Sequence, residues 1–386
     1  MKKRFLKTIL LLAAFCALVS CNEPVFYAIS QEVKPGSPLI VGAPTNFVYF
    51  NGAMYVASGK RLFMYGKVDG DVEWSRHPQP GGRIMCLAAA ENFLYALCYE
   101  SGTRSELKRY EDSSSSWQTL DAGEYNMLQF IYSAENILFI GAGAENSNSY
   151  AVLYLDPVDK QIKPVKTADD KILNRQISGA AFNGTDRLFC TREGGVYTFN
   201  DGTATLIPNS DKDFLGMINL ENSANTIALI TRDGKLHTYN GTSLEQTDKS
   251  FGRYATGALA IWKEKNNPEP RLLLAGRQDS LTYTTNSGYT YGYLELELNA
   301  AGIKGANFSE PGNLKSSGNS ITSIDITDNN ERYKTTIGKC PVNFLFQAPP
   351  ELDEKITLFA STQKNGVWSY RERKDGFQWN AEQEKE

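Results

Sequence analysis

The sequence has few of the residues that build most catalytic and metal-binding sites. Among its 386 residues there are only two histidines, His77 and His237, and six cysteines. The two histidines lie far apart in the chain, which excludes a His-rich zinc site and argues against a Ser-His-Asp triad. Neither a P-loop nor a Gly-rich dinucleotide-binding turn is present. The sequence therefore predicts no catalytic residue, no metal ligand and no cofactor site.

Basic residues are also scarce relative to acidic ones. The chain has 40 Lys and Arg against 44 Asp and Glu, and residues 1–20 hold four of the former and none of the latter. Without residues 1–20 the net charge is 36 − 44 = −8. An acidic body without a basic stripe argues against nucleic acid as a partner.

Long apolar runs are absent after the N-terminus, where a short one occurs. Four basic residues precede and flank the 11-residue apolar run Ile9–Val19, which is too short for a bilayer core that needs roughly 20 residues. Its length and flanks are those of a secretory signal peptide. The following Ser20-Cys21 resembles the bacterial lipobox, which implies that residues 1–20 are removed and that Cys21 is lipidated. The alternative is an ordinary signal peptide in which Cys21 is incidental.

This N-terminus sets the predicted domain organisation and location. We expect a signal peptide over residues 1–20, a lipidated tether over 21–44 and a folded body over 45–386. Acyl chains anchor a protein because each buried CH₂ contributes about 0.8 kcal/mol. Asn22 follows the cysteine in place of the Asp that marks inner-membrane retention in some bacteria, which favours the outer membrane of the cell envelope. The sequence does not distinguish a periplasmic from an outward orientation.

One pattern recurs through the body of the chain. Each repeat begins with an apolar run, a turn and a second apolar run. A polar turn and a short strand that ends in an aromatic residue follow. The second runs are marked by Met54, Leu94, Leu138, Leu188, Ile227, Leu273 and Leu358. The first six of these are 39 to 50 residues apart, the size of a four-stranded propeller blade. The sequence therefore predicts an all-β fold, a β-propeller, with a β-helix or a sandwich as the alternative.

The number of blades depends on one long interval. Leu273 and Leu358 are separated by nearly twice the usual spacing. Either insertions lie between residues 279 and 341, or the segment 320–326 belongs to an eighth, degenerate blade. Residues 299–341 supply only one convincing strand, so seven blades are favoured over eight.

The aromatic residues that end the third strands have a structural interpretation. A large ring at a fixed position fills the wedge that widens between neighbouring blades. We expect these side chains to be core and not a binding ladder. They are Tyr65, Tyr110, Phe199, Tyr239 and Tyr370.

Four cysteines lie in the predicted propeller, and two of them flank one hairpin. Cys86 and Cys98 stand on either side of a turn near Asn92. A disulfide between them is permitted in an exported protein, although antiparallel neighbours seldom have ideal disulfide geometry. The alternative is a pair of buried free thiols.

A tyrosine-rich connection in the sixth repeat is the candidate binding site. Residues 279–293 carry Tyr283, Tyr289 and Tyr291 among Ser, Thr, Gly and Asn, the composition of adaptable contact surfaces. Loops between second and third strands share a propeller face with the connections between blades, so Arg332 and Tyr333 are expected nearby. The alternative is an extended hairpin whose Tyr and Thr residues are ordinary strand formers.

The lipobox at Cys21 and the blade pattern over residues 45–380 resemble those of bacterial β-propeller lipoproteins with WD40- or kelch-like repeats. The resemblance is loosely to the propeller component of the outer-membrane assembly machinery. It implies a non-enzymatic binding or scaffolding module that uses one propeller face, with another envelope protein or a surface ligand as partner. The alternative is a propeller hydrolase of glycans or another envelope polymer, with carboxylates converging from separate blades.

Overall fold

The computed structural model describes residues 39–382 with internal gaps. The gaps are 102–103, 113–114, 144–149, 222–224, 252–255, 265–266, 277–292, 300–301, 304–312, 318–319, 326–341, 364 and 374–375. Within the described residues all regular elements are β-strands. No helix in this part of the chain is long and apolar enough to cross a membrane.

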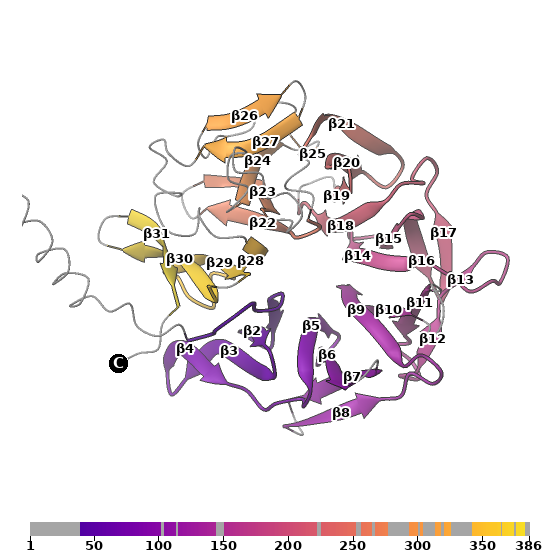
Figure 1. The fold of residues 1–386 in the computed structure, drawn as a ribbon, viewed down its shortest axis with the longest axis horizontal. Coiled ribbons are helices and arrows are strands. Elements are labelled where there is room, and N and C mark those ends of the chain that lie inside the picture. The colour runs from indigo at the N-terminus through magenta and orange to yellow at the C-terminus, as the bar shows by residue number, and fades with distance from the viewer. Residues whose placement is uncertain are drawn as a thin grey trace, which may run out of the picture. The chain divides into compact units, whose positions relative to one another are not determined.

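Seven antiparallel sheets follow one another around a ring and form a seven-bladed β-propeller (Figure 1). Each blade has four strands in sequence order from the centre outward. Blades one to three comprise β1 (Val48–Phe50), β2 (Ala53–Ser58), β3 (Arg61–Val68) and β4 (Asp71–Arg76); β5 (Arg83–Ala90), β6 (Phe93–Ser101), β7 (Arg104–Glu111) and β8 (Ser116–Leu120); and β9 (Met127–Ala134), β10 (Ile137–Gly143), β11 (Tyr150–Leu155) and β12 (Ile162–Pro164). The predicted all-β propeller is confirmed.

The remaining blades continue the same order. Blades four to seven comprise β14 (Gln176–Phe182), β15 (Arg187–Arg192), β16 (Gly195–Asn200) and β17 (Thr203–Leu206); β18 (Phe214–Asn219), β19 (Ile227–Thr231), β20 (Lys235–Tyr239) and β21 (Leu244–Ser250); β22 (Leu259–Glu264), β23 (Asn267–Ala275), β24 (Tyr293–Asn299) and β25 (Gly302–Ile303); and β28 (Val342–Gln347), β29 (Ile356–Thr362), β30 (Val367–Arg373) and β31 (Gly376–Ala381). Every second strand predicted from the repeat lies where the pattern placed it.

Three further strands widen two blades at their outer edges. β13 (Lys166–Thr167) pairs in parallel with β17 of blade four. The hairpin of β26 (Asn313–Ser317) and β27 (Ser320–Asp325) adds to blade five, where β27 pairs in parallel with β21. The segment that could have formed an eighth blade is therefore an edge extension of the fifth, and seven blades is the correct count.

Turn chemistry explains how the strands reverse so tightly. The turn between β1 and β2 is Asn51-Gly52, with φ of 46° and 78°, and the turn between β16 and β17 is Asp201-Gly202, with φ of 44° and 84°. Two successive residues with positive φ make a type I′ turn, whose twist matches that of the strands it joins. Asn or Asp followed by Gly tolerates this backbone best.

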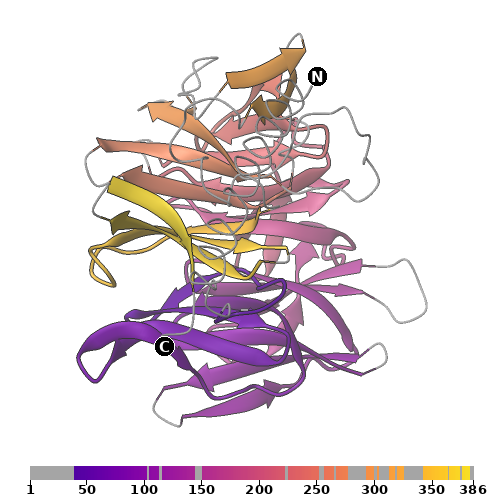
Figure 2. The same ribbon diagram turned by 60° about the vertical axis from the view of Figure 1, so that its left-hand side comes forward.

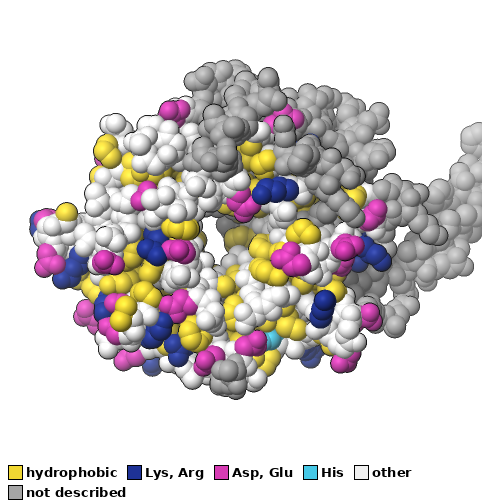
Figure 3. Space-filling model, turned by 180° about the vertical axis from the view of Figure 1, so that it is seen from behind, with side chains coloured by type: hydrophobic (Ala, Val, Ile, Leu, Met, Phe, Trp, Pro, Cys, Tyr) yellow, Lys and Arg dark blue, Asp and Glu magenta, His cyan; other side chains and the backbone are white. Residues whose placement is uncertain are grey.

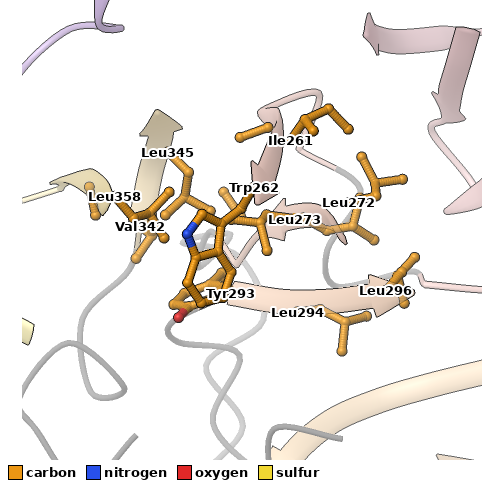
Figure 4. Packing of buried hydrophobic residues seen from close by; sticks show 14 of the residues in the cluster. Ile261, Trp262, Leu272, Leu273, Tyr293, Leu294, Leu296, Val342, Leu345 and Leu358 are labelled. Atoms are coloured by element: carbon orange, nitrogen blue, oxygen red, sulfur yellow. The ribbon is translucent and has the colours of Figure 1, made fainter. Parts of the chain in front are cut away.

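Apolar side chains fill the contacts between neighbouring blades, and one continuous cluster joins blades five, six and seven. The predicted wedge-filling aromatic residues are all buried, with 4% to 6% of their surface exposed. Figure 4 shows the contact of blades six and seven, where Trp262 and Tyr293 lie against Val342, Leu345 and Leu358. Because flat rings fill a widening gap with large apolar area, they hold blades together without covalent links.

The ring closes between blade one and blade seven without a strand shared by the two, and we call this contact the seam. Figure 2 shows the indigo blade one beside the yellow blade seven. Phe359 of β29 packs against Phe47, which directly precedes β1, and against Tyr65 and Trp74 of blade one, with ring centroids 6.1, 5.3 and 6.0 Å apart. The Tyr65 hydroxyl donates a 2.6 Å hydrogen bond to Asp353 Oδ2.

The two ends of the described chain both reinforce the seam. Residues 40–47, which we call the strap, precede β1, and the Gly42 carbonyl accepts a 3.2 Å bond from the Gly366 N–H of blade seven. At the other end Glu382, only 6% exposed, accepts a 2.9 Å bond from Trp74 Nε1 of blade one. The same carboxylate is bonded by Arg371 and Ser369 of its own blade. Each terminus thus joins the blade it does not belong to.

Polar side chains also link the inner strands of neighbouring blades. The Asn46 amide accepts a 3.0 Å bond from the Leu87 N–H and donates a 2.8 Å bond to the Leu87 carbonyl in blade two. Asn219 makes one such bond, 2.8 Å to the Phe182 carbonyl of blade four.

Asn46→Ala is expected to lower the free energy of unfolding by about 1–3 kcal/mol, because it leaves two backbone groups of buried Leu87 unpaired. Asn219→Ala serves as the control and should cost less, since only one bond between blades is lost. Urea unfolding of both variants measures the difference. An equal or smaller loss for Asn46→Ala would contradict this account of the link.

Candidate binding face

The alternation of strand direction sorts all turns onto two faces of the ring. Connections between blades and the turns between second and third strands lie at one end of the strands, and we call this the connection face. Turns between first and second strands and between third and fourth strands lie at the other end, the hairpin face. The predicted binding residues belong to loops of the connection face.

Those predicted residues lie outside the described part of the chain. Tyr283, Tyr289 and Tyr291 fall in 277–292, and Arg332 and Tyr333 fall in 326–341. The predicted lipidation site Cys21 lies in residues 1–38, which are likewise not described. The geometry of the face therefore comes from blades one to five and from the strap.

Exposed apolar side chains gather on this face. Val41 of the strap is 62% exposed, Met85 of β5 47% and Tyr99 of β6 37%. Leu206 of blade four is also exposed toward this end, whereas exposed Ile172 lies beside Lys166, near the start of β17 at the other end. Val158 is the corresponding exposed apolar residue of the hairpin face. Because single exposed apolar residues are common, it is their concentration at one end that marks a contact surface.

Met85 is exposed because of a β-bulge. In the pairing of β5 with β6 the register shifts between Ile84 and Cys86, which leaves Met85 as the extra residue. A bulge re-aims one side chain while its neighbours stay in register. Comparable shifts occur in the inner strands of blades three, four, five and seven. The sequence did not reveal Met85, because Ile84-Met85-Cys86-Leu87 reads as one buried apolar run.

The face surrounds a central channel whose wall includes aromatic rings. Figure 3 shows one side of the ring with an opening at its centre and hydrophobic side chains around it. Phe130 of the inner strand β9 is 39% exposed and stacks on Tyr132, with centroids 6.3 Å apart and an interplanar angle of 25°. Burial raises the pKa of the Tyr132 hydroxyl, which therefore stays protonated and can donate a hydrogen bond.

Ion pairs hold the loops of the connection face in place. Lys108 Nζ, on a largely buried side chain, bonds Glu100 at 3.0 Å, Glu106 at 3.3 Å and the Pro80 carbonyl at 2.8 Å. Burial alone would lower the pKa of Lys108, but the hydrogen bonds to the two glutamates raise it overall. The amine therefore stays charged and fixes the connection between blades one and two.

A second ion pair lies on blades four and five. Asp213 contacts Arg232 at 2.9 Å and Arg192 at 3.6 Å. It joins turns from two neighbouring blades on the connection face. Together with Lys108 it makes this face a firm surface and not a set of independent loops.

The two faces differ strongly in charge. The described turns of the connection face contain eight Asp or Glu and five Lys or Arg. The described turns of the hairpin face contain two lysines, Lys160 and Lys355, against twelve carboxylates. The twelve are Asp69, Glu91, Asp112, Glu135, Asp156, Asp159, Asp186, Asp201, Glu221, Glu351, Asp353 and Glu354. The negative charge of the body is therefore concentrated on the hairpin face.

The disulfide permitted between Cys86 and Cys98 is not formed, and both residues are free thiols. Cys86 pairs with Leu97 and Cys98 with Ile84, so the two side chains leave opposite faces of the blade. Cys98 packs toward blade one and Cys86 toward blade three. The two-residue turn Glu91-Asn92 sets a register in which Cys86 lies opposite Leu97, so the two cysteines expected across one hairpin do not meet.

The described cysteines and histidines are placed as structural residues. Burial raises the pKa of Cys86, Cys98 and Cys190 to about 12, which keeps the thiols protonated and weakly nucleophilic. His77 lies edge-on between Tyr55 and Tyr110, and burial lowers its pKa. No group of three or more metal-ligating side chains occurs among the described residues.

Comparison with known proteins identifies the fold but no family. No known protein family and no curated protein matches the sequence. A chain in the crystal structure of the mitotic checkpoint complex is similar over 86% of this chain and 95% of that one, with 11% identity and a TM-score of 0.51. The extracellular domain of a putative hybrid two-component system from B. thetaiotaomicron is similar over 86% and 39%, with 13% identity and a TM-score of 0.53. At these identities the similarity shows the propeller fold alone.

Proposed function

We propose that this protein is a non-enzymatic binding or scaffolding lipoprotein of the cell envelope, acting through its connection face. Lipid on Cys21 would anchor it, in the outer membrane. The partner is another envelope protein or a surface ligand. The observation that carries the proposal is the set of exposed apolar side chains on the connection face.

The arrangement of side chains on the connection face supports a role in binding a partner. Met85 and Tyr99 stand at the end of blade two, and the buried Lys108 ion pairs hold the adjoining connection. A preformed surface binds with a smaller loss of conformational freedom than a mobile one. Propeller folds occur both in the extracellular domain and in the multiprotein complex described above, and a binding role is compatible with both.

Replacing Met85 and Tyr99 together by Ser is expected to weaken partner binding about tenfold or more, as loss of central apolar contacts does. The measurement is capture from detergent-solubilised envelope on immobilised protein, with quantitative mass spectrometry of what is retained. Val158→Ser is the matched control, because it removes an exposed apolar side chain from the hairpin face. Thermal unfolding should be unchanged in all three proteins.

The opposite pattern would contradict the proposal. If Val158→Ser reduces binding and the Met85 and Tyr99 variant does not, the hairpin face is the contact surface. Equal retention by all three proteins would show that the described part of the connection face does not bind.

A further inference from the structure

We propose that the propeller is oriented on its membrane, with the connection face toward the bilayer and the hairpin face toward the aqueous phase. The orientation rests on the proposed lipid anchor at Cys21. It deepens the proposed function, because the partner of the connection face is then one held at the membrane surface.

The first argument is the point where the tether enters the ring. The strap lies on the connection face beside the seam. Ile40 is fully buried, Ser58 Oγ donates a hydrogen bond to the Val41 carbonyl, and the Thr45 N–H donates a 2.8 Å bond to the Ala57 carbonyl. Together with the bond between Gly366 and Gly42, these contacts fix the entry point on this face.

The second argument is the length of the tether. Residues 22–39 are 18 residues, which span at most about 60 Å when fully extended. Strands of six to eight residues make the ring about 20–26 Å high. To bring the hairpin face to the bilayer, the tether would have to run outward over a blade and then down this height. That path would use most of its length and restrict its conformations.

The third argument is charge, and it is independent of the first two. The described turns of the hairpin face carry twelve carboxylates and two lysines, while the strap has no charged residue. Lys163, Arg187 and Lys263 of the adjoining strands pair with four of these carboxylates, which leaves an excess of seven negative charges. Membranes that contain anionic lipids have a negative surface potential, which repels carboxylates within about a Debye length, roughly 8–10 Å. The hairpin face is therefore repelled more strongly by lipid headgroups than the connection face, whose described turns hold eight carboxylates and five cations.

Energy transfer to the membrane surface tests the orientation directly. The acylated full-length protein is reconstituted in vesicles of phosphatidylethanolamine and phosphatidylglycerol with an acceptor dye on the headgroups. A donor dye is attached through p-azidophenylalanine at Glu124 or at Val158. These positions lie before and within blade three, are both exposed, and belong to the connection and hairpin faces respectively. We expect transfer from position 124 to be at least twice that from position 158.

Two outcomes overturn the inference, and they are distinguishable. Equal transfer, or stronger transfer from position 158, overturns the orientation while leaving the anchor intact. Cys21→Ser should abolish vesicle binding; if it binds as well as the unchanged protein, the proposed anchor is wrong and the orientation falls with it.

Discussion

Phe359→Ala is expected to destabilise the propeller by about 3–5 kcal/mol, the cost of removing a fully buried aromatic ring. Phe359 contacts three aromatic rings across the seam, one from the strap and two from blade one, so the cavity would lie within the seam. Urea unfolding measures the loss. Because only noncovalent contacts join blades one and seven, we also expect this variant to be cleaved faster by protease under native conditions.

Phe139→Ala distinguishes the loss of stability from the opening of the seam. Phe139 is also fully buried and packs against Phe189 and Phe199, with centroids 5.1 and 4.9 Å apart, where blades three and four meet. Its loss should cost a similar free energy of unfolding. Those two blades remain joined by the chain, however, so native-state cleavage should change little. Equal sensitivity of both variants to protease would show that the seam is no weaker than other contacts between blades.

The stability of the propeller is expected to fall as the pH decreases from about 6.5 to 4, in part because of His237. Burial lowers the pKa of this histidine from 6.5 to about 4, and the charge of Lys212 acts in the same direction. Lys235 also lowers the pKa, while Asp233 raises it. The ring lies against Phe214, with centroids 5.4 Å apart. The folded protein therefore holds His237 neutral.

The direction of this pH dependence follows from proton binding to His237 in the folded and unfolded states. Above pH 6.5 the histidine is neutral in both states, and its environment has no pH-dependent effect. Between pH 6.5 and 4 the unfolded chain binds a proton that the folded chain does not, so the free energy of unfolding decreases. The full difference is about 3 kcal/mol and is reached below pH 4. Burial also lowers the pKa of His77, which contributes with the same sign.

His237→Leu should remove this part of the pH dependence. Urea unfolding at several pH values between 4 and 7 should show the wild-type protein losing about 3 kcal/mol more than the variant. Because all carboxylates are common to both proteins, their effects cancel in the difference. An NMR titration in which His237 changes near pH 6.5 in the folded protein would contradict the prediction.

The propeller could be predicted from the sequence because its signals are local. Each blade is specified by short apolar runs and by turns such as Asn51-Gly52 and Asp201-Gly202, whose backbone requirements are visible in the residues themselves. The wedge-filling role of residues such as Tyr65 and Tyr370 followed from their fixed place in the repeat. Because the pattern of apolar runs and turns recurs in seven blades, it could be recognised although each single copy is a weak signal.

Features that depend on distant pairing could not be predicted in this way. The sequence pattern predicts a strand at β27, but β27 pairs in parallel with β21. This pairing joins Ser250 to Ser320, and the whole of blade six lies between them in the sequence. Nothing in either segment specifies that partner, so an eighth blade was a reasonable alternative. The same limit applies to the contact of Glu382 with Trp74, which depends on the ring closing.

The sequence predicts which loops form the candidate face, but it does not predict the exposed apolar residues that the structure describes there. The apolar run around Met85 gave no sign of a bulge, because a one-residue change of register leaves no mark in composition. That single shift leaves Met85 without a partner residue across the hairpin, and Met85 is exposed. Exposed apolar residues at strand ends are thus the part of this face that could not be predicted from the sequence.

The strap has a mechanical consequence. If the proposed lipid anchor holds the N-terminus, a pull on the propeller would pass first into the strap, residues 40–47. Since Gly42 is bonded to Gly366 of blade seven, such a load would be divided between the first and last blades. If the proposed lipid on Cys21 ties the protein to a membrane, the contact that closes the ring is also the contact that bears the tension.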